Sequence, residues 1–200
     1  MTNSTKPRAR AADKRRRLVT EATRVLHEQG VERTTLADIA RAADVPLGNV
    51  YYYFKTKDEL VLAALAEHSA HLDALTSRLD ELPEPRDRLR ALVEAWVGQR
   101  DVAARHGCPT GTLAVELDKR ADGTLDAAVG AVVRRLLDWT GQQFRALGLP
   151  DPDGLAVTFV GAYQGMSLLA NALRDPDVMA REGARLIGWL DSLSAPGRTA

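Results

Sequence analysis

Apolar residues recur at helical spacing along almost the whole chain, and this periodicity limits the fold more than any other feature. After about Asp13, the positions i, i+4, i+7 and i+8 are apolar, as expected for one buried face of a helix: Leu18, Ala22, Val25 and Leu26. Similar stripes occur in residues 57–82, 85–106, 124–147, 152–173 and 177–193, and a short apolar helix is expected over Leu113–Leu117 after a break at residues 107–111. No segment shows a convincing alternation of apolar and polar residues, which a half-buried strand requires. The sequence therefore predicts an all-α fold.

Residues 34–60 contain two short helices with a tight break between them. The hydroxyl of Thr35 is expected to cap the first helix. The run Asp44-Val45-Pro46 ends that helix, because proline cannot continue the hydrogen-bonded ladder and restricts the residue before it. A second short helix is predicted over Leu47–Phe54, and a long helix follows from about Lys57. This is the helix-turn-helix arrangement that places a short helix in a DNA major groove.

The second short helix begins with residue types that a DNA-reading helix needs. A major groove is about 12 Å wide, and a helix that enters it must allow close backbone approach and present polar tips. Gly48 lets the backbone come close, Asn49 can donate and accept hydrogen bonds, and Leu47 can touch a thymine methyl group.

Tyrosines and two flanking residues complete the predicted contact surface. Successive residues on a helix point about 100° apart, so at least one of the three consecutive tyrosines should be exposed: Tyr51, Tyr52 and Tyr53. For each, the alternative is packing between helices, most of all for Tyr51. Lys57 and Thr35 are placed to hold phosphates. The residues expected to lock the helices together are Ile39, Val50, Phe54 and Leu60.

This segment resembles the DNA-binding domain of TetR-type (tetracycline-repressor-like) transcriptional regulators. That family shows a Thr-rich helix start, an Ile-Ala pair, a turn and a Gly-x-x-Tyr-x-x-Phe-x-x-Lys-x-x-Leu run. The matching positions are Thr34-Thr35, Ile39-Ala40, Gly48, Tyr51, Phe54, Lys57 and Leu60, within a match over about residues 18–65. The resemblance implies a dimeric, ligand-responsive repressor of a palindromic operator; an activator would differ only in operator position. It implies DNA contact by Thr35, Leu47, Gly48, Asn49, Tyr51, Tyr52, Tyr53 and Lys57.

The turn and the start of the second helix depart from the family pattern. The turn usually carries Ala-Gly, whereas Ala43-Asp44 asks an aspartate to take a conformation that glycine adopts more easily. The next helix often begins with Ser and Lys, whereas this chain has Pro46 and Leu47. The loss of a hydroxyl and a charge shifts the expected DNA anchoring toward Asn49, the tyrosines, Lys57 and the basic N-terminal residues.

The net charge of zero conceals an uneven distribution. Residues 1–60 contain 12 Lys and Arg against eight Asp and Glu, which leaves 15 against 19 for residues 61–200. A basic end favours a polyanion, and this arm is expected to contact the minor groove or neighbouring phosphates. The alternative is a solvated tail. We predict a disordered basic arm over 1–12, a helix-turn-helix DNA-binding domain over 13–60, and a helical regulatory, ligand-binding and dimerisation domain over 61–200.

The last two predicted helices, residues 152–173 and 177–193, are apolar on more than one face. A helix that is apolar nearly all round is normally buried, and the expected partner is a second copy of the chain, which makes a homodimer. The family resemblance implies a pocket for an apolar or aromatic small-molecule effector. The candidate pocket residues, each with ordinary packing as the alternative, are Trp96, Arg100, Cys108, Leu113, Leu117, Trp139, Phe144, Phe159, Tyr163 and Met166.

Cys108 is the single cysteine of the chain. With one cysteine and no secretory signal, a reducing cytoplasm is the expected location. The run GCPTGTLAVEL resembles a subgroup of the family with a Gly-Cys-Pro-x-Gly-x-Leu pattern, in which some members sense electrophiles or oxidants and others bind aromatic molecules. Cys108 precedes a predicted helix, whose amides favour a thiolate. The alternative is a small buried hydrophobic residue.

A different hypothesis is a helical small-molecule-binding protein or enzyme. Its only acid–base candidates are the four histidines: His27, His68, His71 and His106. His68 and His71 are three residues apart on one helix face, but no third ligand accompanies them. We therefore predict no enzyme activity, no cofactor and no metal. No window approaches the ~18 apolar residues that a membrane span needs, so no membrane partner is predicted. The predicted partners are double-stranded operator DNA, a small-molecule effector and a second copy of the chain.

Overall fold

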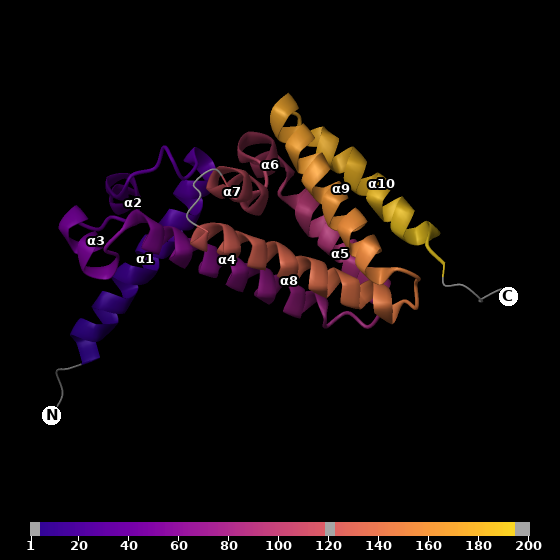
Figure 1. The fold of residues 1–200 in the computed structure, drawn as a ribbon, viewed down its shortest axis with the longest axis horizontal. Helices are drawn as coiled ribbons and strands as arrows, with labels where there is room; N and C mark the ends of the chain where they lie inside the picture. Colours follow the sequence, from indigo (N-terminus) through magenta and orange to yellow (C-terminus); the bar gives the residue numbers. More distant parts are fainter. Residues whose placement is uncertain (1–4, 119–122, 195–200) are drawn as a thin grey trace. The chain divides into compact units, whose positions relative to one another are not determined.

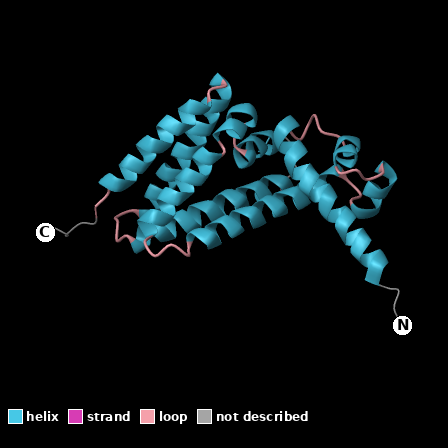
Figure 2. Ribbon diagram, turned by 180° about the vertical axis from the view of Figure 1, so that it is seen from behind, coloured by secondary structure: helices cyan, strands magenta, loops and turns pink. Residues whose placement is uncertain are grey.

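The computed structural model describes residues 5–118 and 123–194, and helices are the only regular elements in these ranges (Figure 1). No strand occurs among the described residues (Figure 2), which confirms the all-α prediction. The described helices are α1 (Thr5–Gln29), α2 (Leu36–Ala42), α3 (Leu47–Tyr53), α4 (Lys57–Leu79), α5 (Pro85–Gly98), α6 (Arg100–His106), α7 (Pro109–Asp118), α8 (Thr124–Ala146), α9 (Pro152–Leu173) and α10 (Pro176–Ser192). None of them combines the length and the apolar character that crossing a membrane requires.

The described residues form two compact units, each with its own core. The first unit contains residues 5–71, 112–118 and 123–130, and the second contains residues 72–111 and 131–194. Residues of α4, α7 and α8 belong to both units. The units do not follow the boundary expected after residue 60, because α4 continues through it without a break and a later segment joins the first core.

α1 begins at Thr5, eight residues before the start near Asp13 that the sequence predicts. Residues 8–17 are Ala, Arg and Lys apart from Asp13, and these three residue types are strong helix formers. Pro7 falls in the first turn, where its missing N–H removes no intrahelical hydrogen bond. The expected disordered arm is therefore corrected to helix from residue 5 onward, while residues 1–4 lie outside the described part of the chain.

The first core joins α1 to the two short helices. The predicted apolar stripe of α1 is buried: Leu18, Ala22, Val25 and Leu26. The four residues predicted to lock the helices are buried in the same core: Ile39, Val50, Phe54 and Leu60. Helices as short as α2 and α3 are marginal alone, and burial contributes roughly 1.5–3 kcal/mol for each large apolar side chain. Packing therefore holds α2 and α3 in place.

A polar contact fastens the loop after α1 to α7 within the first unit. Gly30 ends α1 with a φ of 83°, in the left-handed region that favours glycine. The backbone N–H of Val31 donates a hydrogen bond to the carboxylate of Glu116 in α7. A Cβ atom on Gly30 would collide with this carboxylate. The backbone conformation therefore favours glycine at position 30, and a side chain there would also displace the Glu116 carboxylate from its contact with Val31.

The second core is built mainly from α5, α9 and α10, with α6 and the last turns of α8. Trp96 of α5 stacks on Tyr163 of α9 with ring centroids 4.1 Å apart, and its centroid lies 5.3 Å from that of Phe159. A Cβ atom on Gly183 of α10 would collide with Val97 of α5. These contacts place an aromatic cluster at the centre of the unit and bring α5 and α10 into close approach.

Predicted helix boundaries between α4 and α7 are also wrong, beginning with α4, which ends at Leu79, three residues before its predicted end. The single helix predicted over 85–106 is divided at Gln99, which follows Gly98 and has φ −97° and ψ 11°. Glycine is a poor helix-interior residue, which weakens the ladder at this point. α7 begins at Pro109, four residues before the predicted start at Leu113, because proline fits the first turn of a helix.

α9 buries only one of its faces within the described residues. Its exposed face carries large apolar side chains that are at least half accessible: Val157, Leu168, Leu169 and Leu173. No described atom lies within 4 Å of a Cβ atom built on Gly161 or Gly165. Single exposed apolar residues are ordinary on a protein surface, but a helix face that carries several of them marks an interaction site.

Candidate nucleic-acid interface

A complete capping box starts α2 at Thr35. Thr35 Oγ1 accepts a hydrogen bond from Asp38 N at 3.2 Å, and Asp38 Oδ2 accepts one from Thr35 N at 3.0 Å. The Thr35 hydroxyl also donates to Asp38 Oδ2 at 2.6 Å. These hydrogen bonds, the hydroxyl first and the backbone N–H second, lower the pKa of Asp38. The predicted cap is confirmed, and a DNA phosphate would have to compete with Asp38 for the hydroxyl proton of Thr35.

α2 ends in a Schellman turn that has aspartate where glycine is usual. The N–H of Val45 donates to the carbonyl of Ala40 at 2.9 Å, and the N–H of Asp44 donates to the carbonyl of Arg41 at 3.2 Å. Asp44 has a φ of 51°, in the left-handed region that the sequence predicts for it. A residue with a Cβ atom is strained there. Val45 and Ala40 are both buried, which anchors the turn to the first core.

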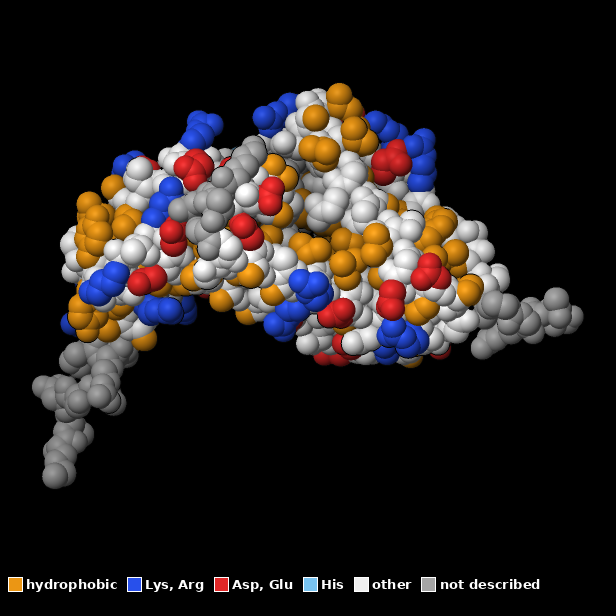
Figure 3. All heavy atoms as spheres, in the orientation of Figure 1, with side chains coloured by type: hydrophobic (Ala, Val, Ile, Leu, Met, Phe, Trp, Pro, Cys, Tyr) orange, Lys and Arg blue, Asp and Glu red, His pale blue; other side chains and the backbone are white. Residues whose placement is uncertain are grey.

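α3 turns one face to the core and the other to solvent. Val50 is fully buried, whereas Leu47, Tyr51 and Tyr52 are 42%, 49% and 74% exposed. Gly48 is exposed, and no atom lies within 4 Å of a Cβ atom built on it. Figure 3 shows apolar side chains at the surface over α3, with Lys and Arg side chains beside them. A partner can therefore approach the backbone of α3 closely.

The three tyrosines do not divide as the sequence predicts. Tyr51, for which packing is the strongest alternative, is exposed, whereas Tyr53 is partly buried against the first core. The rings of Tyr52 and Tyr53 meet edge to face with centroids 5.0 Å apart. Tyr53 lies three residues after Val50, so both residues share the core-facing side of α3.

Basic side chains flank α3, and two of them donate hydrogen bonds to backbone carbonyl groups. Lys57 Nζ donates to the carbonyl of Glu32 at 3.5 Å, and Lys55 Nζ donates to the carbonyl of Tyr51 at 2.8 Å. The guanidinium carbon of Arg15 in α1 lies 5.2 Å from the ring centre of Phe54, a cation–π contact. Neither Lys55 nor a structural role of Arg15 is predicted from the sequence. The position of Lys55 directly after a predicted short helix is the signal that points to it.

The ten candidate pocket residues do not form one group. Leu113 and Leu117 belong to the first core. Most of the others lie in or against the second core: Trp96, Trp139, Phe144, Phe159, Tyr163 and Met166. Trp139 Nε1 donates to Asp80 Oδ1 at 3.1 Å, and Arg100 is half-buried at the start of α6. The aromatic residues of the second core are therefore the part of the prediction that the fold brings together.

Cys108 is buried directly before α7. Its Sγ atom accepts hydrogen bonds from Gly111 N at 3.4 Å and from Gln164 Nε2 at 3.5 Å. Burial, and then the neighbouring Cys108, raise the pKa of Tyr163 well above its usual value of 10.0. Both alternatives considered for Cys108, a small buried residue and a sensing thiol, are therefore compatible with its position.

His68 lies among like-charged groups in the first unit. Burial lowers the pKa of His68, and the charges of His71 and His27 lower it further. The neutral form of the imidazole is therefore favoured in the folded protein. The described residues contain no group of three or more His, Cys, Asp or Glu that could hold a metal ion.

The chain matches two family descriptions. Residues 18–64 match "Bacterial regulatory proteins, tetR family", and residues 85–185 match "Tetracyclin repressor-like, C-terminal domain". The first match contains α2 and α3, and the second runs from the start of α5 into α10. The two matches together span more than half of the 200 residues.

Known relatives agree with these matches. The chain is 32% identical over 162 residues to the transcriptional regulator AcuR of Cereibacter sphaeroides, which covers 76% of this chain and 74% of AcuR. It is 38% identical over 86 residues to the HTH-type transcriptional regulator TtgR of Pseudomonas putida, which covers 42% of this chain and 40% of TtgR.

Solved structures show the same architecture. The crystal structure of the regulatory protein TetR from Rhodobacter sphaeroides has a TM-score of 0.76 at 27% identity and covers 86% of this chain and 96% of that chain. SCO4454, a TetR-family transcriptional regulator from Streptomyces coelicolor, shares the fold with a TM-score of 0.78 at 23% identity, covering 92% of this chain and 97% of that chain. With its buried helix-turn-helix core and exposed α3, the chain belongs to the TetR family, whose members are DNA-binding transcriptional regulators and not enzymes.

Proposed function

We propose that the chain is a homodimeric repressor that binds a palindromic operator through α3 and releases it when a small-molecule effector binds. One observation carries the DNA-binding part of the proposal. α3 exposes Leu47, Tyr51 and Tyr52 beside the open backbone of Gly48, while Val50 on the opposite face is fully buried. A short helix that is held by one face and free on the other can enter a major groove without losing its own packing.

The proposed contact residues have different states in the free protein. Leu47, Gly48 and Asn49 begin α3, and the exposed phenols of Tyr51 and Tyr52 supply donors for phosphates or bases. By contrast, three others already have partners within the chain: Thr35, Tyr53 and Lys57. Their proposed role is to fix the start of α2 and the position of α3, with phosphate contact in competition with those partners.

Dimerisation is proposed through α9 and α10. The uncovered face of α9 carries Leu168 and Leu173, at 67% and 65% exposure, and α9 also carries Gly161 and Gly165, whose Cα atoms are open to close approach. Burial of each large apolar side chain contributes roughly 1.5–3 kcal/mol. A second copy of the same face would cover these residues in an isologous interface.

The oligomeric state tests this interface. Leu168→Glu should convert a dimer to a monomer, because a symmetric contact would bury the carboxylate twice. Val102→Glu in α6, where Val102 is 40% exposed, is the matched control and should remain dimeric. Sedimentation equilibrium measures both, and a dimer that survives Leu168→Glu would place the interface elsewhere.

The remaining assignments belong to the same proposal. We assign residues 13–60 to DNA binding, with α1 extending this segment back to residue 5, and residues 61–200 to regulation and dimerisation. The effector is proposed to be apolar or aromatic, because aromatic side chains dominate the second core around Trp96 and Tyr163. A cytoplasmic location is proposed because the partner is DNA.

A thiol-sensing regulator is the second candidate, in line with the Gly-Cys-Pro-x-Gly subgroup pattern. The observation that favours it is the pair of N–H donors on Cys108 Sγ, from Gly111 and Gln164. Addition of the Cys108 thiolate to the double bond of N-ethylmaleimide should weaken operator binding. Cys108→Ser should bind the operator and resist the reagent, whereas equal inhibition of both proteins would remove this candidate.

Selection of bound sequences from a pool of random DNA duplexes tests DNA recognition without knowledge of the operator. The full-length chain should enrich an inverted repeat with half-sites about one helical turn apart, ~34–36 Å. The same selection with Tyr52→Ala should enrich it less. Failure of the wild-type chain to enrich any sequence would contradict the proposed function.

A further inference from the structure

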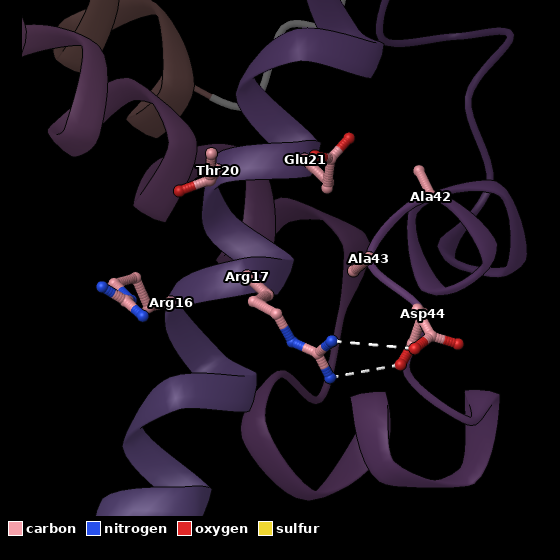
Figure 4. Close-up of a pocket in the computed structure, with 7 residues that line it drawn as sticks. All are labelled: Arg16, Arg17, Thr20, Glu21, Ala42, Ala43 and Asp44. Carbon is pink, nitrogen blue, oxygen red and sulfur yellow. Dashed lines mark hydrogen bonds and ion pairs between the residues drawn. The ribbon is translucent and has the colours of Figure 1, made fainter.

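We propose that Arg17 of α1 positions the recognition helix by bracing the left-handed conformation of Asp44 in the turn between α2 and α3. The inference rests on the proposed DNA-binding function and assigns a role to a residue that lies outside the helix-turn-helix itself. Its basis is a groove of about 460 Å³ between α1 and this turn. The groove is lined by Arg16, Arg17, Thr20, Glu21, Ala42, Ala43 and Asp44 (Figure 4).

Arg17 crosses this groove and holds Asp44 at two points. Its Nη2 atom donates to the backbone carbonyl of Asp44 at 3.2 Å, and its Nη1 atom lies 3.8 Å from Asp44 Oδ2. Figure 4 shows the guanidinium group extending from α1 to the turn, whereas Arg16 points away from it. Arg16 is paired instead with Asp13 on its own helix. The two adjacent arginines therefore have different roles.

The turn needs a brace because Asp44 occupies a position that suits glycine. With a φ of 51°, its Cβ atom is held in a region that L-residues rarely adopt. Its side chain is 99% exposed, so it gains nothing from packing. A hydrogen bond from a charged donor is stronger than one from a neutral donor. The Arg17 contact with the carbonyl therefore favours the strained conformation over the alternatives open to the backbone.

The conformation of Asp44 contributes to the direction of α3, together with the packing of α3 against the first core. Only Val45 and Pro46 separate Asp44 from the first residue of α3, and the ring of Pro46 restricts the backbone further. Pro46 offers no side-chain cap to α3. A change in φ or ψ at Asp44 would therefore rotate the exposed face of α3 as a body, and with it Tyr51 and Tyr52.

These contacts leave Arg17 poorly placed to bind a phosphate of the DNA backbone. Its side chain is 39% exposed, compared with 74% for Arg16. Its Nε atom lies 3.8 Å from Asp13 Oδ2, while the other two nitrogen atoms face Asp44. The planar fork of a guanidinium group can reach a carbonyl and a carboxylate together, which the single ammonium group of lysine cannot do with the same geometry.

A double-substitution experiment tests the brace with the operator duplex selected by the full-length chain. Arg17→Ala should weaken operator affinity about five- to tenfold, which is within the range for the loss of one partly exposed hydrogen bond. Asp44→Gly removes the strain that the brace opposes. Arg17→Ala in the Asp44→Gly background should therefore weaken binding less than about twofold, because glycine adopts the turn conformation without assistance.

Two further readouts separate positioning from phosphate contact. Loss of positioning should lower the ratio of operator affinity to random-duplex affinity and leave the salt dependence unchanged. Loss of a phosphate contact would weaken both duplexes alike and reduce the slope of log affinity against log salt by about 0.9. Arg17→Lys should behave like Arg17→Ala if geometry matters, and like the wild type if only charge matters.

Arg24→Ala is the matched control, since Arg24 lies on the same helix and pairs only locally in this structure, with Glu21 and Glu28. It should leave operator affinity unchanged, and all variants are compared below their melting temperatures. An equal loss for Arg17→Ala in both backgrounds, or wild-type behaviour of Arg17→Lys, would overturn the brace. Failure to select any specific duplex would instead reject the proposed DNA-binding function, so the two failures are distinct.

Discussion

Three residues other than glycine have a left-handed backbone within the described chain: Asp44, Asp151 and Arg174. Each makes polar contacts that compensate for the strain. Asp44 receives the Arg17 guanidinium group, and the Asp151 carboxylate accepts a hydrogen bond from Gly154 N at 3.1 Å. Arg174 donates to the backbone carbonyl of Ala104 at 3.3 Å. At the residue scale, these three exposed positions are therefore constrained by backbone conformation rather than by burial.

Gly30→Ala should destabilise the protein by roughly 1–3 kcal/mol, the range for a residue with a side chain in a sparsely populated backbone region. The φ of 83° and the collision with Glu116 both contribute. Urea unfolding measures the change. Gly130→Ala is the control: Gly130 lies within α8 with no atom within 4 Å of a built Cβ, so alanine should stabilise the helix by roughly 0.5–1 kcal/mol. Equal effects at the two positions would contradict the role of Gly30.

His68 should make the stability depend on pH. Its folded-state pKa lies below the ordinary value of 6.5 because burial and the charges of His71 and His27 oppose protonation. Above pH 6.5 the imidazole is neutral in both states. As the pH falls below that value, the unfolded chain binds a proton that the folded chain resists, and stability is lost.

Urea unfolding between about pH 8 and about pH 5 measures this loss. His68→Gln should reduce the decrease in stability below pH 6.5. His106→Gln in α6 controls for the removal of a histidine elsewhere. A decrease that is the same in His68→Gln and the wild type would exclude His68 as its source.

At the scale of single elements, α3 combines a buried structural face and a proposed DNA-binding face within seven residues. The sequence predicts the first residue of α3 correctly and its last residue to within one position. Pro46 marks the start of the helix, and the break at residues 55–57 marks its end. The sequence does not predict which tyrosines are buried, since that depends on how α3 packs against the first core. The division of roles can be measured with paired variants.

Tyr52→Ala should weaken operator binding by about tenfold, as expected when a large exposed aromatic contact is lost, and should lower stability only by the roughly 0.5–1.5 kcal/mol of its ring contact with Tyr53. Tyr53→Ala should instead lower the free energy of unfolding by about 1–3 kcal/mol, because Tyr53 packs against the first core. Fluorescence anisotropy with a labelled operator and thermal unfolding separate the two effects. An equal loss of operator affinity and of stability in the two variants would contradict this division.

Helix boundaries are predicted well where proline marks them and poorly where they depend on tertiary packing. α9 begins and ends at the predicted residues because Pro152 and the Asp175-Pro176 pair mark its limits. By contrast, the apolar stripe of residues 85–106 continues across Gln99, so periodicity alone does not reveal the break between α5 and α6. Pro109 is predicted to break a helix and instead begins one, because proline is compatible with both positions. The division of pocket candidates between two cores depends on tertiary packing, which no local pattern contains.

At the scale of the whole molecule, the uneven charge distribution becomes relevant to DNA binding. Residues 10–17 carry their basic side chains on a helix rather than on a disordered arm. A helix fixes the positions of these charges along its axis, with a rise of about 1.5 Å per residue. In a dimer, two such helices would act together with two copies of α3.

Operator affinity should fall with salt, and the slope of log affinity against log salt should be about 0.9 for each phosphate contact. Deletion of residues 1–12 should reduce that slope because it removes Lys6, Arg8 and Arg10. A matched variant that lacks only residues 1–5, which contain no Lys or Arg, should retain it. An unchanged slope after the longer deletion would show that these basic residues are only solvated.

The stack of Trp96 on Tyr163 has an optical consequence. With their rings 4.1 Å apart and nearly parallel, the indole and the phenol are electronically coupled. Light absorbed by Tyr163 should pass to Trp96, and the emission of Trp96 should report any molecule that separates the two rings. Trp139 and Trp189 supply the background, which Trp96→Phe would reveal by subtraction. The protein thus carries an intrinsic fluorescent probe inside its second core, with which candidate effectors can be screened without a label and without knowledge of the operator.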